Sequence, residues 1–407
     1  WERQGRRNVM NMELKVVSVS IVMPCLNEAA TIVPCVKRAK EALDILFERH
    51  GLTGEVIVAD NGSSDGSQGL ATEAGARVVD VDEKGYGAAL MGGFRAARGQ
   101  YFVMGDSDCS YDFVEAVPMI EKLVAGADIC MGSRFKGEIR EGAMPWKNKY
   151  IGNPALSGIL RLLVRTDVND AHCGLRALTR DAFDEMRLSS TGMEFASEMV
   201  MKAAIMDMNI AEVPVTLSPD GRGRPPHLNP WRDGFRHLFF MLMLCPSWLF
   251  IVPAVGLFAV GLAMMTALLA GDAGMVSFGP FSIGDHWAVA ASAFLILAVQ
   301  IGAMGIVATA HSYHERIRKP VGAIGAFLKG SKLTHWLFSG LGAMGAGVIW
   351  AAAITAGWIG ADYGSLDAVR DLIAAFTLIV IGMQVAFTGF LLSIVTGNRL
   401  SHKPVWG

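Results

Sequence analysis

The sequence lacks the cysteine patterns that would indicate a zinc site or a disulfide framework. Its six cysteines form no CxxC pair and no Cys/His cluster with zinc spacing. All six precede or border an apolar C-terminal half, in a part of the chain that the distribution of basic residues places in the cytoplasm. Free thiols are therefore expected. The six are Cys25, Cys35, Cys109, Cys130, Cys173 and Cys245.

Charged residues are also scarce. They make up 18% of the 407 residues, against 52% hydrophobic residues, whereas soluble proteins average about 25% charged residues. The formal net charge of −2 provides no basic excess, so nucleic-acid binding is not indicated. The scarcity is uneven, because charges are frequent up to the region of Phe235 and long apolar runs dominate after it.

Four long apolar runs fill the C-terminal half. A helix needs about 20 apolar residues to cross the roughly 30 Å hydrocarbon core of a bilayer. Each run reaches that length without Lys, Arg, Asp or Glu in its interior, which predicts an all-α membrane domain of four transmembrane helices. The expected spans are Ser247–Ala270, Trp287–Ala310, Leu333–Ile359 and Leu372–Gly397.

The loops between these runs differ in their basic residues. The loop after the first span has no Lys or Arg, whereas the loop after the second span has five. Because basic loops stay on the cytoplasmic side, this asymmetry sets the orientation of the chain. We predict a multi-pass membrane protein whose N-terminal domain, second loop and C-terminus are cytoplasmic.

Polar residues are few inside the spans, Gln300 and Gln384 being examples. Transporters usually carry ionisable groups or broken helices at mid-membrane, so an anchor or a platform for a lipid substrate is favoured. The stretch NPWRDGFRHLFFMLML before the first span mixes basic, aromatic and apolar residues and predicts an interfacial amphipathic helix. The expected division is a polar N-terminal tail at 1–15, a cytoplasmic domain at 16–227, this juxtamembrane helix at 228–246 and the four-helix membrane domain at 247–400.

The N-terminal half alternates apolar strands with helical stretches. Apolar strands joined by helical crossovers predict an α/β domain with a mostly parallel sheet, which binds ligands beyond the carboxyl ends of its strands. Polar motifs follow four of these ends, at Pro24–Glu28, Asp60–Gly66, Asp106–Asp108 and Ser133–Arg134. The expected strands are 16–24, 55–60, 76–81, 100–106 and 128–134.

The stretch GDSDCSYD, at 105–112, places three carboxylates at the end of a buried strand. An EF-hand would need Gly at the sixth loop position and Glu at the twelfth, where this sequence has Tyr111 and Val117. The remaining interpretation is that Asp106 and Asp108 bind Mg²⁺ or Mn²⁺ at a diphosphate. Asp112 is expected to cap the following helix instead.

The run DNGSSDGS after the second strand has two explanations, which the residues alone leave open. Its turn formers are compatible with a simple connection between strand and helix. The carboxylate of Asp60 beside helix-start amides is equally compatible with a site for a base or ribose. The Gly pair of KGYG, at Gly85 and Gly87, carries little information by itself.

Taken together and in order, six motifs resemble the family-two inverting glycosyltransferases of the GT-A fold. The similarity covers residues 16–225, and the nearest branch is the dolichyl- or polyprenyl-phosphate mannose and glucose synthases. Membrane spans after the catalytic domain also match that branch. The motifs are IVMPCLNEAATI, VIVADNGSSDGS, GYGAALMGGF, GDSDCSYD, MGSRF and DAHCGLRALTRDAF.

The resemblance implies a GT-A, Rossmann-like catalytic domain with donor and acceptor sites. On the donor side it assigns nucleoside contacts to Pro24, Asn27, Glu28 and Asp60. It makes Asp106 and Asp108 the DxD pair that faces the nucleotide-sugar and holds a divalent metal, Mg²⁺ or Mn²⁺. Asp108 is the firmer ligand, and Ser110 stands where some relatives place a Gln ligand.

On the acceptor side the resemblance implies a set of basic residues around a lipid phosphate. Arg134 of GSRF would bind the acceptor phosphate, and Lys147 is the best match for a second basic contact, with Lys149 as the alternative. Arg176 of CGLR matches an Arg of the branch and joins Asp108, Arg134 and Lys147 in the implied catalytic set. Arg222 and Arg224 match a basic loop near the phosphates.

The implied activity is transfer of a hexose, with inversion, from a nucleotide-sugar to a polyprenyl or dolichyl phosphate in the bilayer, and UDP is favoured as the donor nucleotide. A phosphate monoester has a second pKa of about 6, so it attacks as a dianion without a general base. Two alternatives stay open, a GDP-mannose-dependent mannose synthase and a non-catalytic membrane scaffold. A homo-oligomer is also left open.

Overall fold

The computed structural model describes residues 17–164, 166–221, 230–271, 275–278, 281–314, 322–363 and 368–397. The chain divides into two compact units, Trp1–Leu244 and Cys245–Gly407. The expected N-terminal tail at 1–15 lies outside the described residues.

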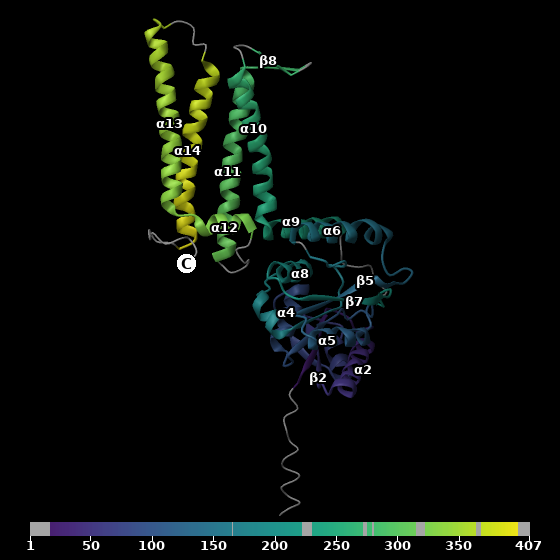
Figure 1. Cartoon of the computed structure of the whole chain (residues 1–407). Coiled ribbons are helices and arrows are strands. Elements are labelled where there is room, and N and C mark those ends of the chain that lie inside the picture. The colour runs from purple at the N-terminus through teal and green to yellow at the C-terminus, as the bar shows by residue number, and fades with distance from the viewer. Residues whose placement is uncertain are drawn as a thin grey trace, which may run out of the picture. The chain divides into compact units, whose positions relative to one another are not determined.

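A seven-stranded mixed sheet organises the first unit (Figure 1). Its strand order is β3-β2-β1-β4-β6-β5-β7, and only β6 runs antiparallel to its neighbours. The prediction of a mostly parallel sheet is confirmed, although β6 and β7 were missed and β5 extends further than expected. The strands are β1 (Val19–Cys25), β2 (Gly54–Asp60), β3 (Arg77–Asp80), β4 (Tyr101–Met104), β5 (Ile129–Ile139), β6 (Arg176–Thr179) and β7 (Ile210–Leu217).

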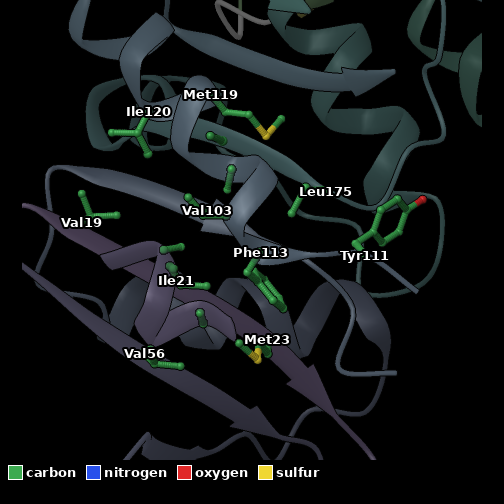
Figure 2. Packing of buried hydrophobic residues seen from close by; sticks show 14 of the residues in the cluster. Val19, Ile21, Met23, Val56, Val103, Tyr111, Phe113, Met119, Ile120 and Leu175 are labelled. Carbon is green, nitrogen blue, oxygen red and sulfur yellow. The ribbon is translucent and has the colours of Figure 1, made fainter. Parts of the chain in front are cut away.

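Helices cover both faces of this sheet, because side chains along a strand alternate between the two faces. Val19, Ile21 and Met23 of β1 point into one core with α2 and α5, which Figure 2 shows around Phe113. Val22 of the same strand joins the opposite core with α4, α7 and α8. The helices are α2 (Ile32–His50), α3 (Ser67–Glu73), α4 (Tyr86–Ala96), α5 (Val117–Val124), α6 (Asn153–Val164), α7 (Arg180–Met186), α8 (Phe195–Ile205) and α9 (Pro230–Leu244).

Asp112 caps the helical segment that follows the acidic stretch, as predicted. Its Oδ1 accepts a hydrogen bond from the backbone N–H of Val114, 3.0 Å away. The capped turn is a 3₁₀ helix, Phe113–Ala116, which leads directly into α5. This use of Asp112 separates it from Asp106 and Asp108.

The stretch 228–246, expected to form the juxtamembrane helix, contains the helix α9, which belongs to the first unit. It packs against α6 and α8, and Figure 1 shows it running beside α6. A π-helical turn, Asn148–Gly152, precedes α6. These helices therefore form one layer of the sheet-containing unit.

Within its described residues, the second unit contains four helices with the length and apolar composition of membrane spans, as predicted. They are Ser247–Ala270, His286–His314 (α11), Leu333–Gly360 (α13) and Val369–Val395 (α14). The first comprises a π-helical turn, Ser247–Ile251, and α10 (Val252–Ala270). A short hairpin of β8 (Met275–Phe278) and β9 (Phe281–Gly284) and a short helix, α12 (Gly322–Gly330), complete the described part of the unit.

Polar and glycine contacts hold the membrane helices together. Gln384 of α14 donates to Gln300 of α11 over 3.2 Å. A Cβ on Gly382 would lie 2.5 Å from the backbone nitrogen of Met344, so only glycine permits this approach of α13 and α14. The polar residues noted inside the spans thus make helix–helix contacts.

Candidate active site

The polar motifs after β1, β2 and β4 meet at one edge of the sheet. Cys25 at the end of β1 is in register with Asp60 at the end of β2. On the other side of β1, Val22 pairs with Met104, the last residue of β4. The hydroxyl of Ser107 donates to the carbonyl of Pro24 over 2.7 Å. The predicted strand-end motifs therefore do lie together.

The loops after β1 and β2 are tied to each other by side chains. Asn27 has a left-handed backbone, φ 59°, and its Oδ1 accepts from the N–H of Ser64 over 2.8 Å. The backbone N–H of Glu28 donates to the hydroxyl of Ser67 over 2.9 Å. The serines of DNGSSDGS therefore hold the PCLNE loop in place, which is more than a simple turn between strand and helix would require.

Asp60 is a buried carboxylate with one engaged and one unengaged oxygen. Its Oδ2 accepts from the N–H of Gly62 and of Ser63, each at 3.0 Å, and from Gln68 Nε2 at 2.7 Å. Its Oδ1 is buried and has no hydrogen-bond partner among the described residues. Burial would raise the pKa of Asp60, but the bonds from Ser63, Gln68 and Gly62 outweigh it and lower the pKa below its usual value. The group is thus ionised at neutral pH.

Asn61 and Lys84 join the strand-end loops, and sequence reasoning did not identify either. Asn61 Nδ2 donates to the carbonyl of Glu83 over 2.7 Å, and its Oδ1 accepts from the N–H of Gly85 over 2.8 Å. Lys84 Nζ donates to the carbonyl of Asn61 over 2.7 Å. An exposed cation is thereby held next to Asp60. The position of the lysine directly before the Gly85–Gly87 pair was the available signal.

Gly85 is needed where this loop meets the segment before α8. Its φ is 134°, and a Cβ there would lie 2.2 Å from the carbonyl oxygen of Thr191. A Cβ on Gly87 would lie equally close to the carbonyl oxygen of Ser190. The glycine pair of KGYG therefore allows close approach of two backbones at the start of α4.

Asp106 lies among aromatic and glycine neighbours. It is hydrogen-bonded to the hydroxyl of Tyr86, whose pKa is raised well above its usual value by burial and then by the charge of Asp106. A Cβ on Gly174 would lie 2.6 Å from Asp106 Oδ2 and 2.8 Å from the ring of Tyr111. The N–H of Gly174 also donates to the Tyr111 hydroxyl over 3.1 Å. The glycine of CGLR therefore leaves room for the first DxD carboxylate.

Asp108 and Ser110 are both almost fully buried. Asp108 Oδ1 accepts from the N–H of Ser110 over 3.0 Å, while the carbonyl of Ser110 accepts from the N–H of Ser218. The N–H of Gly221 donates to the carbonyl of Asp108 over 2.8 Å. The segment after β7 thus runs alongside the acidic loop. The predicted Arg222 and Arg224 lie outside the described residues.

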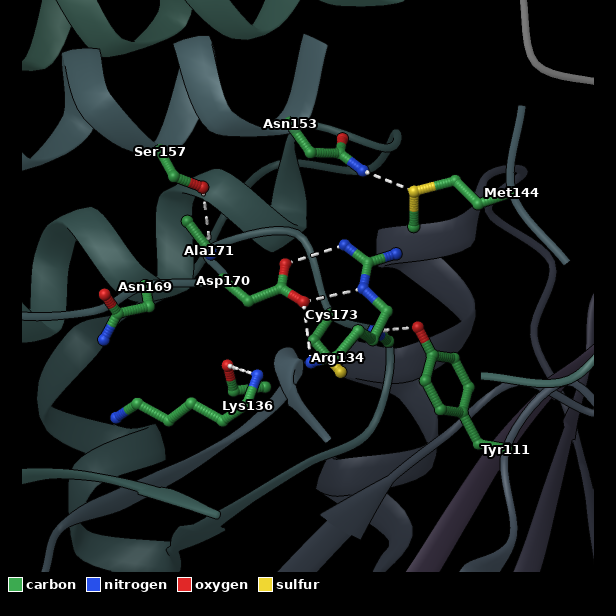
Figure 3. Close-up of polar contacts among 12 residues, drawn as sticks. Tyr111, Arg134, Lys136, Met144, Asn153, Ser157, Asn169, Asp170, Ala171 and Cys173 are labelled. Atoms are coloured by element: carbon green, nitrogen blue, oxygen red, sulfur yellow. Dashed lines mark hydrogen bonds and ion pairs between the residues drawn. The ribbon is translucent and has the colours of Figure 1, made fainter. Parts of the chain in front are cut away.

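Arg134 reaches the same edge through β6, which joins β4 to β5. Arg176 at the start of β6 pairs with Met104 of β4 and with Met131 of β5. Arg134 is 7% exposed and forms a two-pronged ion pair with Asp170, as Figure 3 shows. Its Nε and Nη2 each donate to one carboxylate oxygen over 2.7 Å.

Asp170 is a further residue that sequence reasoning missed. It is fully buried and also accepts from the backbone N–H of Arg134 over 3.0 Å. Although burial would raise its pKa, the hydrogen bonds and charge of Arg134 lower it below the usual value. The predicted acceptor arginine is therefore held rigidly by a carboxylate from the DAHCGLR motif.

Arg176 has a different environment from the one expected of a catalytic residue. It is 0% exposed. Its guanidinium donates to the carbonyls of Cys173 at 2.8 Å, Ala196 at 2.6 Å and Ala171 at 2.9 Å. Backbone carbonyls surround its guanidinium, and within the described part of the chain it forms no ion pair with a carboxylate. In this position Arg176 braces the 171–173 segment against α8, whereas the resemblance assigns it to the catalytic set.

Lys147 and Lys149 lie on a basic and aromatic segment before α6. Lys147 Nζ is 5.9 Å from the ring centroid of Trp146, and Lys149 Nζ is 5.6 Å from that of Tyr150. Trp146 and Tyr150 are 62% and 68% exposed. Exposed aromatic rings next to lysines are typical of segments at a bilayer surface.

Comparison with known proteins identifies the family. Residues 20–187 match the model of glycosyl transferase family 2, and residues 306–396 match that of the glycosyltransferase family 2 C-terminal transmembrane region. The chain is 36% identical over 378 residues to the low-salt glycan biosynthesis hexosyltransferase Agl6 of Haloferax volcanii, covering 92% of this chain and 88% of that protein. The chain belongs to glycosyltransferase family 2.

More distant relatives cover about half of this family-2 glycosyltransferase. A dolichol-phosphate mannosyltransferase of Pyrococcus furiosus is 28% identical over 51% of this chain and 58% of its own length. Among solved structures, glucosyl-3-phosphoglycerate synthase of Mycobacterium tuberculosis is 23% identical, with a TM-score of 0.45, over 56% of this chain and 80% of that one. The predicted order of a GT-A domain followed by four apolar helices is confirmed.

The acidic loop of this glycosyltransferase fits a hard divalent cation. The described residues contain no group of three or more His, Cys, Asp and Glu side chains that could hold a metal. Asp106 and Asp108 offer oxygen ligands only, and Mg²⁺ is usually bound by one or two carboxylates plus substrate phosphates and water. The residues present therefore suit Mg²⁺ or Mn²⁺ in the presence of a diphosphate, and they do not suit a protein-enclosed metal.

Proposed function

We propose that this glycosyltransferase moves a hexose from a UDP-linked sugar to a polyprenyl or dolichyl phosphate. The observation that carries the proposal is the common sheet edge. At this edge, the pairing of β4 with β6 and of β6 with β5 brings the loop of Asp106 and Asp108 near Arg134, which Asp170 holds in place. The described part of the same chain also contains four candidate membrane spans. Acidic groups for a metal-bound diphosphate and a fixed guanidinium for a phosphate match both substrates.

On the donor side, the nucleoside would contact the loops after β1 and β2. Pro24, Asn27 and Glu28 line one loop, and Asp60 ends the other. The unengaged Oδ1 of Asp60 is an acceptor for a base or ribose donor group. Lys84, in the loop after β3, donates to the carbonyl of Asn61 and is therefore a cation next to the end of β2.

Asp106 and Asp108, with Ser110 as the third candidate, would hold the divalent metal. When bound there, Mg²⁺ or Mn²⁺ offsets the charge of the diphosphate leaving group. Tyr86 keeps its proton and donates it in a hydrogen bond to Asp106, which fixes the direction of that carboxylate. Gly174 leaves the space that this orientation needs.

On the acceptor side, the phosphate of the lipid would bind Arg134, with Lys147 and the basic Arg222 and Arg224 as further contacts. Its second pKa of about 6 leaves it largely dianionic at neutral pH, so no protein base has to remove a proton. The phosphate oxygen attacks the anomeric carbon of the sugar as the nucleoside diphosphate leaves, and the configuration at that carbon inverts. Asp170 keeps the guanidinium oriented for this phosphate.

The membrane segments support a lipid acceptor. Trp146 and Tyr150 expose their rings beside Lys147 and Lys149, and α9 leads into the first candidate span after only two residues. We place the catalytic unit, the loop after the second span and the C-terminus on the cytoplasmic side, since the basic residues of the loops favour that orientation.

A mannose donor is the second candidate, because two relatives are named dolichol-phosphate mannosyltransferase. One assay separates the candidates. Full-length protein in nanodiscs is incubated with native lipid extract and with radiolabelled UDP-glucose, UDP-N-acetylglucosamine or GDP-mannose. Label from UDP-glucose in the lipid fraction supports the proposal, and label from GDP-mannose alone supports the second candidate. Label in no lipid product contradicts both and favours the scaffold.

A further inference from the structure

A buried cluster of His172, Ser197 and His237 connects α9 with the segment that carries Asp170. The Ser197 hydroxyl lies 2.8 Å from His237 Nδ1 and 3.4 Å from His172 Nε2. The two imidazole rings meet edge to face with centroids 5.1 Å apart. Because one hydroxyl can donate to one ring and accept from the other, Ser197 bridges them.

The three residues come from three different elements. His237 is on α9, Ser197 is in the first turn of α8, and His172 is two residues after Asp170. Arg176 strengthens the link, since it bonds the carbonyls of Ala171 and Cys173 on one side and that of Ala196 on the other. The Asp170 segment is thus fixed to α8 through two neighbouring positions of that helix.

The inner face of α9 is the face that makes this contact. His237 is 9% exposed and Met241, one turn later, is 0% exposed. Phe235, Phe239 and Met243 lie on the opposite face with exposures of 53%, 61% and 67%. A helix with one buried face and one exposed aromatic face suits the surface of a bilayer.

α9 is also coupled to the membrane by the chain itself. It ends at Leu244, and the first candidate span begins at Ser247. A helix that is inserted at the bilayer surface and joined to a span so closely has its position set by the membrane. Its contact with Ser197 then passes that position on to α8 and to the Asp170 segment.

We propose that His237, Ser197 and His172 are positioning residues that make the orientation of the Asp170–Arg134 pair depend on the seating of α9 at the bilayer. The inference rests on the proposed function, in which Arg134 binds the lipid phosphate. The neutral state of His172, whose pKa is lowered to about 3 by burial and then by His237, lets its ring pack there without adding charge beside Arg176.

Backbone amides near Asp170 report on this link. Ala171 N–H donates to Ser157 Oγ over 3.4 Å and Gly174 N–H donates to Tyr111 over 3.1 Å, contacts that Figure 3 includes. Hydrogen exchange is measured by mass spectrometry on the full chain in nanodiscs, for Ser197→Ala and His237→Leu. We expect exchange of the 166–176 peptide to rise about fivefold, while a peptide over 61–68 stays unchanged.

Arg236→Gln is the matched control, because Arg236 precedes His237 on α9 and its side chain is 54% exposed in its ion pair with Glu194 at 3.1 Å. This variant should leave exchange at 166–176 unchanged. His237→Asn keeps a polar group near the Nδ1 position and should restore protection partly. Equal exchange in wild type and Ser197→Ala, or a rise of similar size in both peptides, would overturn the proposal.

A kinetic measurement separates positioning from general damage. With labelled donor and polyprenyl phosphate, Ser197→Ala should raise the KM for the lipid about threefold to tenfold and leave the KM for the nucleotide-sugar within twofold. Equal effects on both KM values would contradict the inference. If wild type transfers no sugar to a lipid phosphate, the proposed function fails, and the exchange experiment still decides whether α9 is linked to the Asp170 segment.

Discussion

The carboxylate of Asp170 holds the guanidinium of Arg134 in a buried, two-pronged ion pair with both N–O distances at 2.7 Å. The pair fixes the one arginine of GSRF at the strand edge that also presents the DxD carboxylates. Arginine is suited to phosphate recognition because its donors form a rigid fork, and Asp170 occupies one side of that fork. We therefore expect Asp170 to support both the stability of the fold and, in the proposed function, acceptor binding.

Replacement of Asp170 should damage both properties. Asp170→Ala leaves the charge of Arg134 buried without its partner, which costs about 3–5 kcal/mol in the free energy of unfolding. Asp170→Asn should cost less and should raise the KM for the lipid phosphate more than that for the donor. Thermal unfolding in detergent and steady-state kinetics measure the two effects.

The ion pair of Lys136 with Glu212 is the control for that comparison, because the lysine side chain is 48% exposed and the carboxylate keeps its hydrogen bonds from Asn169 without it. Lys136→Gln should change the free energy of unfolding by less than about 1 kcal/mol. If Lys136→Gln and Asp170→Ala lowered the free energy of unfolding by similar amounts, burial of the Asp170–Arg134 pair would not be the cause of the loss.

Gly174 should tolerate no side chain. The Cβ of Gly174→Ala would lie 2.6 Å from Asp106 Oδ2, so the carboxylate or the chain must shift. Because we propose that Asp106 binds the metal, a shift of this size should lower kcat by about 10-fold to 100-fold. Transfer assays measure the loss, and circular dichroism confirms the fold.

Gly69→Ala in α3 is the matched control, since a Cβ at Gly69 meets no atom within 4 Å. This substitution should leave kcat unchanged and should stabilise the helix slightly. Equal activity of Gly174→Ala and wild type would contradict the close approach of Asp106 to the CGLR segment.

His172 should make stability fall as the pH is lowered from neutral. Its folded pKa is about 3 against an ordinary value of 6.5, so below pH 6.5 the unfolded chain gains a proton that the folded chain does not take. Stability should therefore drop by up to about 1.4 kcal/mol per pH unit. Asp170 does not contribute in this range. Its ordinary pKa is 3.8 and its pKa in the folded chain is lower, so the stability it provides is lost only when the pH falls to about 3.8 and below.

Thermal unfolding between pH 7.5 and pH 5 tests this expectation. His172→Asn should remove the slope that His172 causes, and His50→Gln, at an exposed position, should keep the wild-type slope. The same slope in all three proteins would mean that His172 titrates alike in the folded and unfolded chains.

The glycine contacts of α13 and α14 should determine the stability of the membrane unit. Gly382→Leu forces a side chain against the backbone of Met344, and overpacking of this kind costs about 1–3 kcal/mol. Gly342→Leu is the control, as a Cβ there meets no atom within 4 Å. In detergent, Gly382→Leu should unfold at a clearly lower temperature than Gly342→Leu. The reverse order would contradict the close packing of α13 against α14 at Gly382.

Much of this architecture could be predicted because it depends on local patterns. The four spans need only length and apolar composition, and the strand-end motifs follow from runs such as EVIVAD. β6 was missed because its four residues, RALT, are too few to show a period and gain their strand structure from β4 and β5. β7 was missed because it contains Pro214, and a proline within a run argues against a strand. The structure accommodates this proline because β7 lies at the edge of the sheet.

The side-chain partners in the site could not be predicted for a different reason. The pairing of Arg134 with Asp170 joins residues 36 positions apart, and nothing in either motif fixes that contact. Arg176 was expected in the catalytic set because it matches an arginine of the glycosyltransferase branch that the six motifs resemble. Only the three-dimensional arrangement of Ala171, Cys173 and Ala196 shows that backbone carbonyls surround it.

The central claim is metal-dependent transfer of sugar to a lipid phosphate, and one comparison of acceptors tests it most directly. Full-length protein in nanodiscs receives labelled UDP-glucose with polyprenyl phosphate or with the polyprenol of the same chain length. We predict labelled lipid from the phosphate only, lost with EDTA, restored by Mg²⁺ or Mn²⁺, and reduced at least about 100-fold in Asp108→Ala. Transfer to the polyprenol, or full activity of Asp108→Ala or with EDTA, would contradict the account.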